Sequence, residues 1–334
     1  MKEVFVGIDI GGTKTAISLV SYERTTVDEI RIVCKSKFST PVGEQAVHAL
    51  DMIKKNIDSL VSSSECAGTA IRAIGISCGG PVDSTHGIIK NPPNLYGWFH
   101  VPIVDVLQEK YGCNVYMQND ANACALAEWH FGAGKNTSNM IFLTMGTGMG
   151  AGLILNKRLY CGTNDMAGEI GHVRLSGFGP VGYGKIGSFE GFTSGFGISQ
   201  IARDYALVEL QNGKTTAYCD SITSLSSITA KTVAMAARNN DPVAIQVYRT
   251  VGEYLGKGLS ILIDILNPEM IVIGSIYARD TNLMVDSMQK ELEKEALPTA
   301  RSVCKVVPAA LGECIGDYAA FTVALYGEGY VNEE

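Results

Sequence analysis

The chain has 334 residues, 46% of them hydrophobic, which suffices for one large core or two ordinary ones, and typical domain sizes favour two. Charged residues make up 18%, and the formal net charge of −7 provides no long-range attraction for DNA, RNA or an anionic membrane. The nine cysteines are scattered singly, no apolar signal segment stands at Met1, and the apolar stretch around 259–276 is broken by polar residues. We therefore expect a cytoplasmic protein that acts on small molecules, contacts neither nucleic acid nor membrane, and keeps its cysteines as buried small hydrophobic residues.

The first half of the chain predicts alternating strands and helices. In chain order, strands are expected at 4–8, 15–20, 73–77 and 115–117, and helices at 45–61 and 121–129. The apolar face of the first helix is expected to carry Val47, Leu50, Ile53, Ile57 and Leu60. The first two strands are joined by the tight turn Gly11-Gly12, so the chain opens on a glycine hairpin rather than on a strand-to-helix turn.

A second glycine hairpin opens the other half. Its strands are expected at 140–144 and 153–155, with the glycine-rich run 146–152 between them. The two hairpins have the same pattern of strand, glycine turn with threonine, and strand, which suggests two related halves. Further elements are a helix at 241–266, opened by a cap and a proline and ended by Asn267-Pro268, a strand at 270–274, and a last helix at about 315–326.

Both glycine turns are candidate phosphate-binding loops, but neither fits a standard motif. Gly7 to Gly12 has the spacing of a P-loop, yet Thr13-Lys14 follow in the wrong order and lead into a strand. The run 146–151 matches the dinucleotide fingerprint as a string, but a strand follows where that motif needs a helix, so a dehydrogenase is a remaining alternative that rests on the string alone. Backbone N–H groups of both turns, with the hydroxyls of Thr13 and Thr147, can bind phosphates. Asp9, just before the first turn, then favours a Mg²⁺ ion beside them.

Two sets of side chains are candidates for the reacting centre. Phosphoryl transfer needs one carboxylate to accept the proton of the attacking hydroxyl, and Asp120 lies where a strand ends and a helix begins. The alternative is that Asn119 or Asp120 serves as the helix N-cap. Glu169 and His172, three residues apart, could present a carboxylate and an imidazole to a sugar, or could form an ordinary turn with a surface histidine.

Seven motifs in order resemble the sugar kinases of the ROK family: GIDIGGTKT, GPVD, NPPNLYGW, NDANACALAE, GTGMGAGLI, AGEIGH and NPEMIVIG. The resemblance implies an α/β, actin-like ATPase (ribonuclease H-like) fold with two domains and a cleft between them. It also implies a homodimer. The expected domains are 1–120, completed by about 310–334, and 121–309.

The resemblance also assigns roles to residues. It implies that Asp120 is the general base and that the sugar is bound by Asn119, Glu169, His172 and Glu190. It implies that ATP is bound by Gly11, Gly12, Thr13, Lys14, Gly146, Thr147, Gly148 and Gly274, with Asp9 at the Mg²⁺ ion near the phosphates.

The chain departs from the family pattern after AGEIGH. Three cysteines that usually join the histidine in a structural zinc site are replaced by Val181, Tyr183 and Ser188. We therefore expect no structural zinc. We hypothesise instead that an aromatic cluster holds this loop, made of Phe178, Tyr183, Phe189 and Phe192. Two smaller departures are Cys78-Gly79 in a sugar-side loop, and Gly274-Ser275 where a glycine pair usually meets the adenine.

The function expected from the sequence is ATP-dependent phosphorylation of a hexose or an N-acylhexosamine, giving a sugar phosphate and ADP. A sugar-binding sensor, or a degenerate kinase without phosphotransfer, is the alternative. Retention of Asp9, Asp120 and both glycine hairpins argues against a degenerate kinase. The family's repressors carry an N-terminal helix-turn-helix, for which a strand beginning at Val4 is expected to leave no room.

Overall fold

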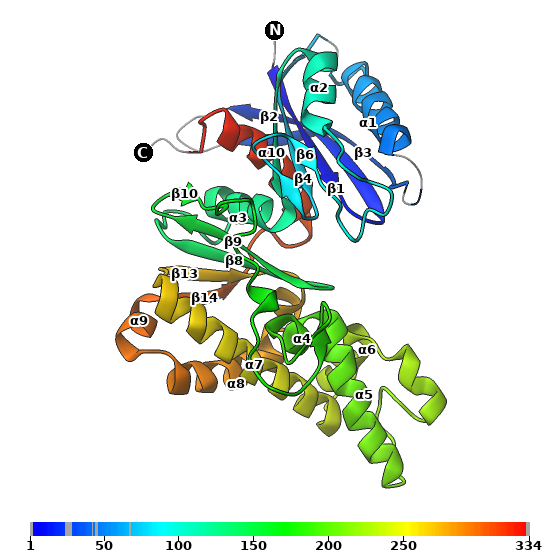
Figure 1. The fold of residues 1–334 in the computed structure, drawn as a ribbon, viewed down its shortest axis with the longest axis vertical. Coiled ribbons are helices and arrows are strands. Elements are labelled where there is room, and N and C mark those ends of the chain that lie inside the picture. The colour runs from blue at the N-terminus through cyan, green and yellow to red at the C-terminus, as the bar shows by residue number, and fades with distance from the viewer. Residues whose placement is uncertain (1–2, 24–28, 42, 44–45, 67, 332–334) are drawn as a thin grey trace. The chain divides into compact units, whose positions relative to one another are not determined.

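The computed structural model in Figure 1 describes residues 3–23, 29–41, 43, 46–66 and 68–331. The chain forms two compact units. Unit 1 comprises Met1–Asn136, Gly152–Ala167 and Glu313–Glu334, and unit 2 comprises Thr137–Ala151 and Gly168–Gly312. The domain limits expected from the sequence stay a prediction, because compact units and functional domains need not divide a chain at the same residues.

Unit 1 is built on a mixed sheet. Its strands are β1 (Glu3–Ile10), β2 (Lys14–Glu23), β3 (Glu29–Ser39), β4 (Ala70–Cys78) and β7 (Asn114–Asn119), beside a small pair, β5 (Val82–Asp83) and β6 (Ile88–Ile89). The five long strands have the order β3-β2-β1-β4-β7, with antiparallel pairs β1–β2 and β2–β3 and parallel pairs β1–β4 and β4–β7. The helices are α1 (Ala46–Val61), α2 (Ile103–Tyr111), α3 (Asp120–Phe131) and α10 (Ile315–Gly327).

Alternate residues of β1 face different helices. Val6 is fully buried in a hydrophobic cluster that the sheet shares with α1 and α2. On the other face, a Cβ on Gly7 would lie 2.9 Å from the backbone nitrogen of Phe321, and one on Gly75 would lie 2.1 Å from a carbonyl oxygen of α10. These glycines therefore let α10 pack directly on the sheet backbone. Asp9 lies on the α10 face, because side chains alternate along a strand.

Unit 2 contains most of the second sheet and most of the helices. The strands of this sheet are β8 (Met140–Met145), β9 (Met149–Leu155), β10 (Arg158–Leu159), β13 (Met270–Ile273) and β14 (Lys305–Pro308), and a small hairpin is made by β11 (Val181–Gly182) and β12 (Lys185–Ile186). The order is β10-β9-β8-β13-β14, and the limit between the units falls within β9, so β10 counts with unit 1. The helices are α4 (Phe189–Thr193), α5 (Gly195–Gln211), α6 (Ala230–Arg238), α7 (Pro242–Leu266), α8 (Ile276–Glu295) and α9 (Pro298–Val303). The 3-10 helices of the chain are η1 (Ile170–His172), η2 (Ile222–Ser227) and η3 (Gly312–Cys314).

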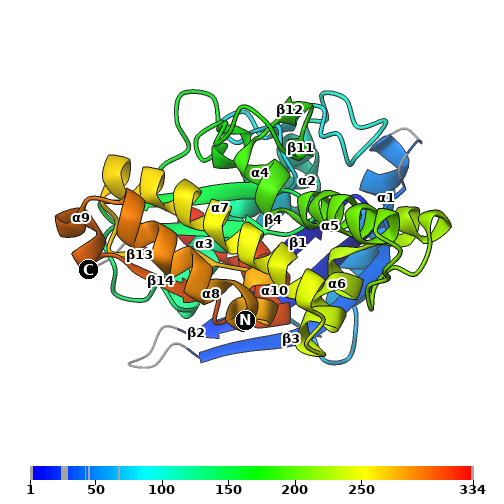
Figure 2. The same ribbon diagram turned by 90° about the horizontal axis from the view of Figure 1, so that it is seen from below.

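Helix α7 begins where the sequence predicts and packs along α8 (Figures 1 and 2). The carboxylate of Asp241 accepts hydrogen bonds from the N–H groups of Val243 and Ala244, the second and third residues of the helix, and Asn267 ends it in the left-handed conformation. Cβ atoms on Gly252 and Gly256 would lie 2.6 and 2.7 Å from carbonyl oxygens of α8. Two glycines one turn apart therefore allow the two helix backbones to approach closely.

The alternation of strands and helices and the two related halves are confirmed. Each half begins with a glycine hairpin, and each five-stranded sheet has the same order, in which the third, second and first strands in sequence precede the fourth and fifth. The position predicted for Val47 is wrong, since its side chain is 61% exposed at the start of α1. Gln45, the predicted first residue of that helix, lies outside the described residues.

The expectation that the cysteines are all buried is wrong in part. Only Cys66, Cys78 and Cys219 are buried, and Cys314, which directly precedes α10 at the surface, is exposed. The remaining cysteines are partly buried, and all are free thiols. None of the helices in the described part of the chain is both long and apolar enough to cross a bilayer.

Candidate functional site

The first glycine turn joins β1 to β2 in unit 1. The N–H of Gly11 donates to the carbonyl oxygen of Lys14 at 3.0 Å, and Thr40 Oγ1 donates to the carbonyl oxygen of Gly11 at 2.7 Å. The next two N–H groups, of Gly12 and Thr13, have no acceptor among the described residues. Two adjacent unpaired N–H groups suit the oxygens of a phosphate.

Other features of this turn concern its side chains. Those of Thr13 and Lys14 are exposed. A Cβ on Gly12 would lie 2.5 Å from the carbonyl oxygen of Asn94, so packing against residues 91–98 also requires glycine here. Glycine at position 12 is thus required by packing, and the same turn can also bind a phosphate.

Asp9 lies beside this turn in a negatively charged environment. Desolvation is the main cause that raises its pKa from 3.8 to about 6, a hydrogen bond with Ser77 opposes the rise, and the charges of Asp120 and Asp317 add to it. A Cβ on Gly316, at the start of α10, would lie 2.8 Å from Oδ2 of Asp9. The carboxylate therefore approaches the first turn of α10, where no larger side chain fits between them.

Asn119 and Asp120 lie at the junction of β7 and α3. Oδ1 of Asn119 accepts the N–H of Asn122 at 2.7 Å, so the alternative that Asn119 is the N-cap is correct. Oδ1 of Asp120 accepts the N–H of Ala121 at 2.8 Å. The side chain of Asp120 is accessible, yet desolvation by the surrounding protein raises its pKa above the usual value. The cap uses only Oδ1 of Asn119. The Nδ2 group has no partner among the residues described, so the Asn119 side chain can still donate hydrogen bonds to a ligand.

The second glycine turn joins β8 to β9 in unit 2 and resembles the first. The N–H of Gly146 donates to the carbonyl oxygen of Gly148 at 3.0 Å, and Gly195 donates to the carbonyl oxygen of Gly146 at 2.8 Å. The N–H groups of Thr147 and Gly148 have no acceptor in the part of unit 2 that the structure describes. Both turns thus use their first N–H group to close the turn and leave the following two available.

Glu190 contacts this second turn directly. Its Oε2 accepts the N–H of Met149 at 3.0 Å. A Cβ on Gly148 would lie 2.7 Å from the same oxygen. The structure therefore brings a candidate sugar ligand together with a candidate ATP loop, a connection that the sequence does not reveal because the two are more than 40 positions apart.

Glu169 directly precedes η1, and His172 is the last residue of this helix. Both side chains are exposed, and the His172 ring makes an edge contact with Tyr183 at a centroid distance of 6.2 Å. A Cβ on Gly171 would lie 3.3 Å from Cβ of Glu190, so η1 packs against the start of α4. Glu169, His172 and Glu190 thus belong to one packed region of unit 2.

The aromatic cluster expected in the loop after His172 is wrong for two of its four members. Phe178 is 73% and Tyr183 is 78% exposed, whereas Phe189 and Phe192 are buried. Tyr183 lies in the turn between β11 and β12 with a positive φ, which directs its side chain away from the core. Phe192 stacks on Tyr254 of α7, with the ring centroids 3.4 Å apart.

Backbone hydrogen bonds and one serine hold this loop. The carbonyl oxygen of Gly187 accepts the N–H groups of both Leu175 and Ser176, at 2.8 and 3.1 Å. Ser188, at one of the expected cysteine positions, is fully buried and accepts the N–H of Gly191 at 3.1 Å as the N-cap of α4. The loop therefore has a structure of its own that places Glu190 in the first turn of α4.

Gly274 and Ser275 connect β13 to α8. The N–H of Gly274 donates to the carbonyl oxygen of Leu143 at 2.9 Å, and a Cβ there would lie 3.0 Å from the ring of Phe142. Ser275 has φ 54° and ψ −113°, a conformation that glycine adopts readily and serine does not. The backbone conformation at position 275 therefore suits the second glycine that the family usually has there, and serine is strained in it.

Sequence reasoning missed the residues that surround Asp9. Lys35 of β3 forms an ion pair with Asp317 of α10, and both charges act on Asp9. They are 282 positions apart in sequence, so no local pattern connects them. The only available signal was Asp317 in the first turn of the last predicted helix.

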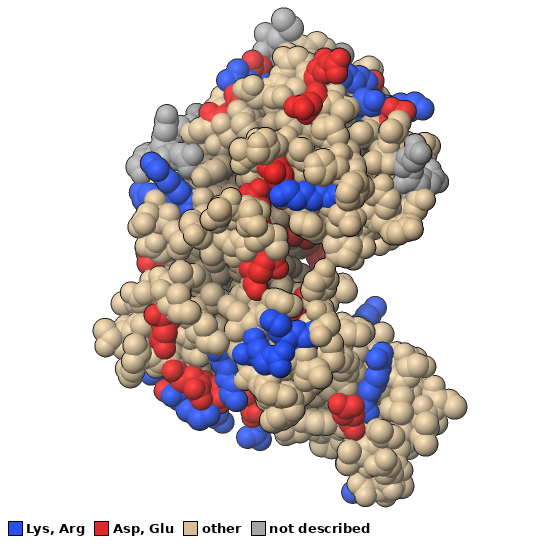
Figure 3. Space-filling model, viewed as in Figure 1, with Lys and Arg blue, Asp and Glu red and all other residues tan. Residues whose placement is uncertain are grey.

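Charged side chains and cavities also occur away from the candidate site residues. In Figure 3, most of the face in view is uncharged, and acidic and basic side chains both occur on it. Two cavities lie elsewhere: one beside β7 and α2 in unit 1, which includes Gln118 but not Asp120, and one beside α8 and α9 in unit 2. Among the described residues, no group of three or more His, Cys, Asp or Glu side chains could hold a metal ion without further ligands.

Comparison with known proteins identifies relatives along the whole length. A glucokinase of Halalkalibacterium halodurans is 32% identical over 316 residues, which cover 93% of this chain and 92% of that protein. A xylose repressor of Bacillus subtilis is 27% identical over 310 residues, which cover 92% of this chain and 73% of the repressor.

Solved structures agree with these relatives. A ROK family glucokinase from Streptomyces griseus, in complex with glucose and AMPPNP, has a TM-score of 0.72 at 29% identity, covering 95% of this chain and 97% of that chain. A ROK hexokinase from Thermus thermophilus has a TM-score of 0.76 at 26% identity, covering 98% and 99%. A model of the ROK family matches residues 5–325. The chain therefore belongs to the ROK family and has its actin-like ATPase fold.

Proposed function

We propose that this protein is an ATP-dependent kinase that transfers a phosphoryl group to a hydroxyl of a hexose or an N-acylhexosamine. The observation that carries the proposal is Asp120, an accessible carboxylate at the start of α3 whose pKa is raised by desolvation. A base is most effective when its pKa approaches the working pH. In this role Asp120 accepts the proton of the sugar hydroxyl as that oxygen attacks the γ-phosphorus of ATP.

The two glycine turns are assigned to ATP. Gly12 and Thr13 in one turn, and Thr147 and Gly148 in the other, provide pairs of backbone donors without acceptors in the described chain. Such donors are fixed before the substrate arrives, so they stabilise phosphate charge without reorganisation. Gly11, Lys14, Gly146 and Gly274 complete the proposed ATP-binding set.

Asp9 fits a Mg²⁺ ligand. Mg²⁺ is commonly bound through one or two carboxylates, with waters and substrate phosphates as its other ligands, so a larger cluster of acidic side chains is unnecessary. The charges of Asp120 and Asp317 disfavour an ionised Asp9, and a divalent cation would reverse this effect. When bound, Mg²⁺ supplies neutralisation of the phosphate charge.

The sugar is assigned to Asn119, Glu169, His172 and Glu190. The free Nδ2 donors of Asn119, the exposed Glu169 and His172, and the remaining acceptor capacity of Glu190 can bind vicinal hydroxyls. The glucokinases among the relatives make glucose the first sugar to test. A homodimer and a cytoplasmic location stay predictions.

A second candidate function is a sugar-responsive regulator without transfer activity. It is favoured by the similarity to a xylose repressor over 92% of this chain. Such a protein would bind a sugar and leave ATP intact, so a transfer assay separates the two functions.

The test is ADP release from ATP and Mg²⁺ across hexoses, N-acylhexosamines and β-glucosides, with wild type beside Asp120→Asn. The variant keeps the acceptor for the N–H of Ala121 and removes the base, so it should still bind the sugar and lose about 10²- to 10⁴-fold in rate. Sugar binding without ADP release in the wild type would support the regulator instead.

A further inference from the structure

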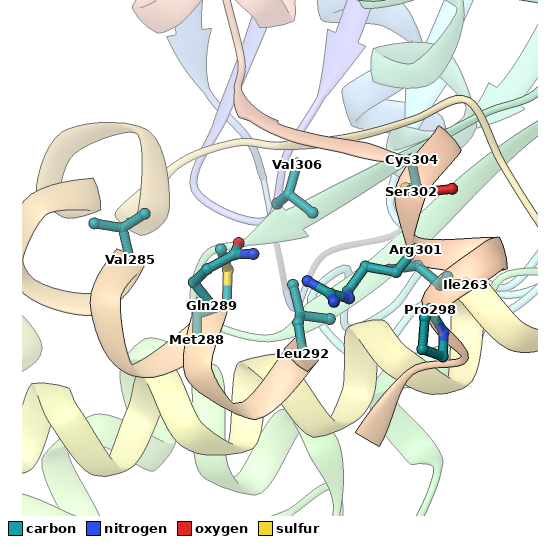
Figure 4. A pocket seen from close by; sticks show the side chains of 10 residues that line it. All are labelled: Ile263, Val285, Met288, Gln289, Leu292, Pro298, Arg301, Ser302, Cys304 and Val306. Atoms are coloured by element: carbon teal, nitrogen blue, oxygen red, sulfur yellow. The ribbon is translucent and has the colours of Figure 1, made fainter. Parts of the chain in front are cut away.

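A cavity of about 270 Å³ lies in unit 2, apart from all the residues assigned above (Figure 4). It is open to solvent on one side and is lined by the end of α7, by α8 and α9, and by β14, the edge strand of the second sheet. Its aliphatic lining consists of Ile263, Val285, Met288, Leu292, Pro298 and Val306. Its polar lining consists of Gln289, Arg301, Ser302 and Cys304.

Arg301 is the one charged residue of this lining, and its guanidinium extends toward Leu292 in Figure 4. Its Nε is fully buried and has no hydrogen-bond partner in the described structure. Its only ion pair there is a long one, 3.8 Å from Nη1 to Oε1 of Glu293, whose side chain is 55% exposed. The Arg301 side chain is 30% exposed, so water reaches part of its guanidinium, and Nε is the donor left without an acceptor.

A buried donor without an acceptor is costly, and an acceptor inside the cavity would relieve that cost. The other polar groups do not serve. Ser302 donates its hydroxyl hydrogen to the carbonyl oxygen of Thr299 at 2.8 Å. Burial raises the pKa of Cys304 to about 11, so at neutral pH the thiol carries no negative charge. Gln289 has an amide oxygen that can accept, but this side chain is exposed and makes no hydrogen bond with Arg301. The missing partner is therefore an acceptor that none of these side chains supplies in the described structure.

We propose that this cavity binds a small monocarboxylate with a short aliphatic body. A carboxylate matches the planar fork of Arg301 and can accept two parallel N–H bonds. One guanidinium balances one negative charge, whereas a phosphate dianion would leave excess charge against the aliphatic wall. The volume lies near the lower end of small-molecule sites, which limits the aliphatic body to a few carbons.

The ligand would occupy an accessory site, since no lining residue belongs to the residues proposed for ATP, Mg²⁺ or sugar. The inference does not depend on the proposed kinase activity. Binding is measured directly, so failure of either idea leaves the other open to its own test.

The experiment is isothermal titration of the full-length protein with pentanoate, pentan-1-ol, acetate and inorganic phosphate at neutral pH. Pentanoate should bind at least about tenfold more tightly than pentan-1-ol, which has the same body without the charge, because hydrogen bonds to charged groups are worth more than neutral ones. Acetate should bind more weakly, because it lacks the aliphatic body.

Variants test the assignment to Arg301. Arg301→Gln should weaken pentanoate about tenfold or more, and Arg301→Lys should weaken it less, because lysine keeps the charge but loses the fork. The matched control is Arg249→Gln, which removes one positive charge from an exposed position of α7 and should leave binding unchanged.

Three results would overturn the proposal: no binding of pentanoate, equal binding of pentan-1-ol, or unchanged affinity in a folded Arg301→Gln. Tighter binding of inorganic phosphate would replace the carboxylate with a phosphate as the ligand and so refute the stated class. The ligand comparison uses wild type alone, so it decides the question even where Arg301→Gln does not fold.

Discussion

Replacing Asp9 by asparagine should stabilise unit 1 while abolishing activity. The fold raises the pKa of Asp9 from 3.8 to about 6, mainly by desolvation, so the native structure disfavours the ionised carboxylate. Native protein then binds more protons than unfolded chain between these two values, and stability falls as the pH rises through that window. Well below pH 3.8 the group is neutral in both states, and the native state bears no such cost.

The size of the effect follows from the shift. A change from 3.8 to about 6 corresponds to about 3 kcal/mol at pH values above 6, taken as an upper limit because Asp9 is only partly buried and water screens its charge. For a unit of this size, that is a rise in the unfolding midpoint of up to about 6 to 12 °C for Asp9→Asn at pH 7.5. Near pH 4 the difference between variant and wild type should largely disappear.

Tryptophan fluorescence provides the assay, because Trp98 and Trp129 are the only tryptophans and both lie in unit 1. Thermal unfolding of wild type and Asp9→Asn is compared at pH 4 and 7.5. The matched variant is Ser77→Ala, which removes a hydrogen bond that favours the charged Asp9 and should lower the midpoint at pH 7.5. In the double variant, with both Asp9→Asn and Ser77→Ala, the decrease in midpoint caused by Ser77→Ala should be smaller, because no charged Asp9 remains. A gain for Asp9→Asn that is equal at both pH values, or no gain, would refute the reasoning.

The remaining predictions concern unit 2 and are read by calorimetry, except for the last. Ser275→Gly should raise stability by about 1 to 2 kcal/mol, because it relieves a positive φ, and a loss would mean that Ser275 makes a stabilising contact instead. Phe192→Ala should lower the free energy of unfolding by about 3 to 5 kcal/mol, because this ring is buried. Tyr183→Ala should lower it by less than about 0.5 kcal/mol, because this ring is exposed. Equal losses would mean that both rings belong to one aromatic cluster after all. Gly148→Ala should displace Glu190 and raise the KM for sugar about tenfold or more in a steady-state assay, and an unchanged KM would remove Glu190 from the sugar site.

The sequence predicts the elements whose signals are local. The hairpins around Gly11-Gly12 and Gly146–Gly148 follow from apolar runs on both sides of the glycines, and α7 follows from its cap, its proline and the asparagine that ends it. The repeated hairpin pattern suggests two related halves, whereas the strand order that the two sheets share is known only from the structure.

What the sequence does not predict depends on distant contacts. Lys35 and Asp317 act on Asp9 from elements at opposite ends of the chain, and Glu190 reaches the second glycine turn only because η1 and α4 pack there. The error at Phe178 and Tyr183 has a related origin. Residue type shows that a ring favours burial, but in an irregular loop the backbone decides which way it points.

The central claim is that the chain transfers a phosphoryl group with Asp120 as the base. The most direct measurement is mass-spectrometric detection of sugar phosphate formed from glucose, or from the sugar that the panel identifies, with ATP and Mg²⁺. Wild type should form product, and Asp120→Asn should form about 10²- to 10⁴-fold less at equal sugar binding. Sugar phosphate formed at the same rate by both proteins, or sugar bound by wild type without any product, would contradict it.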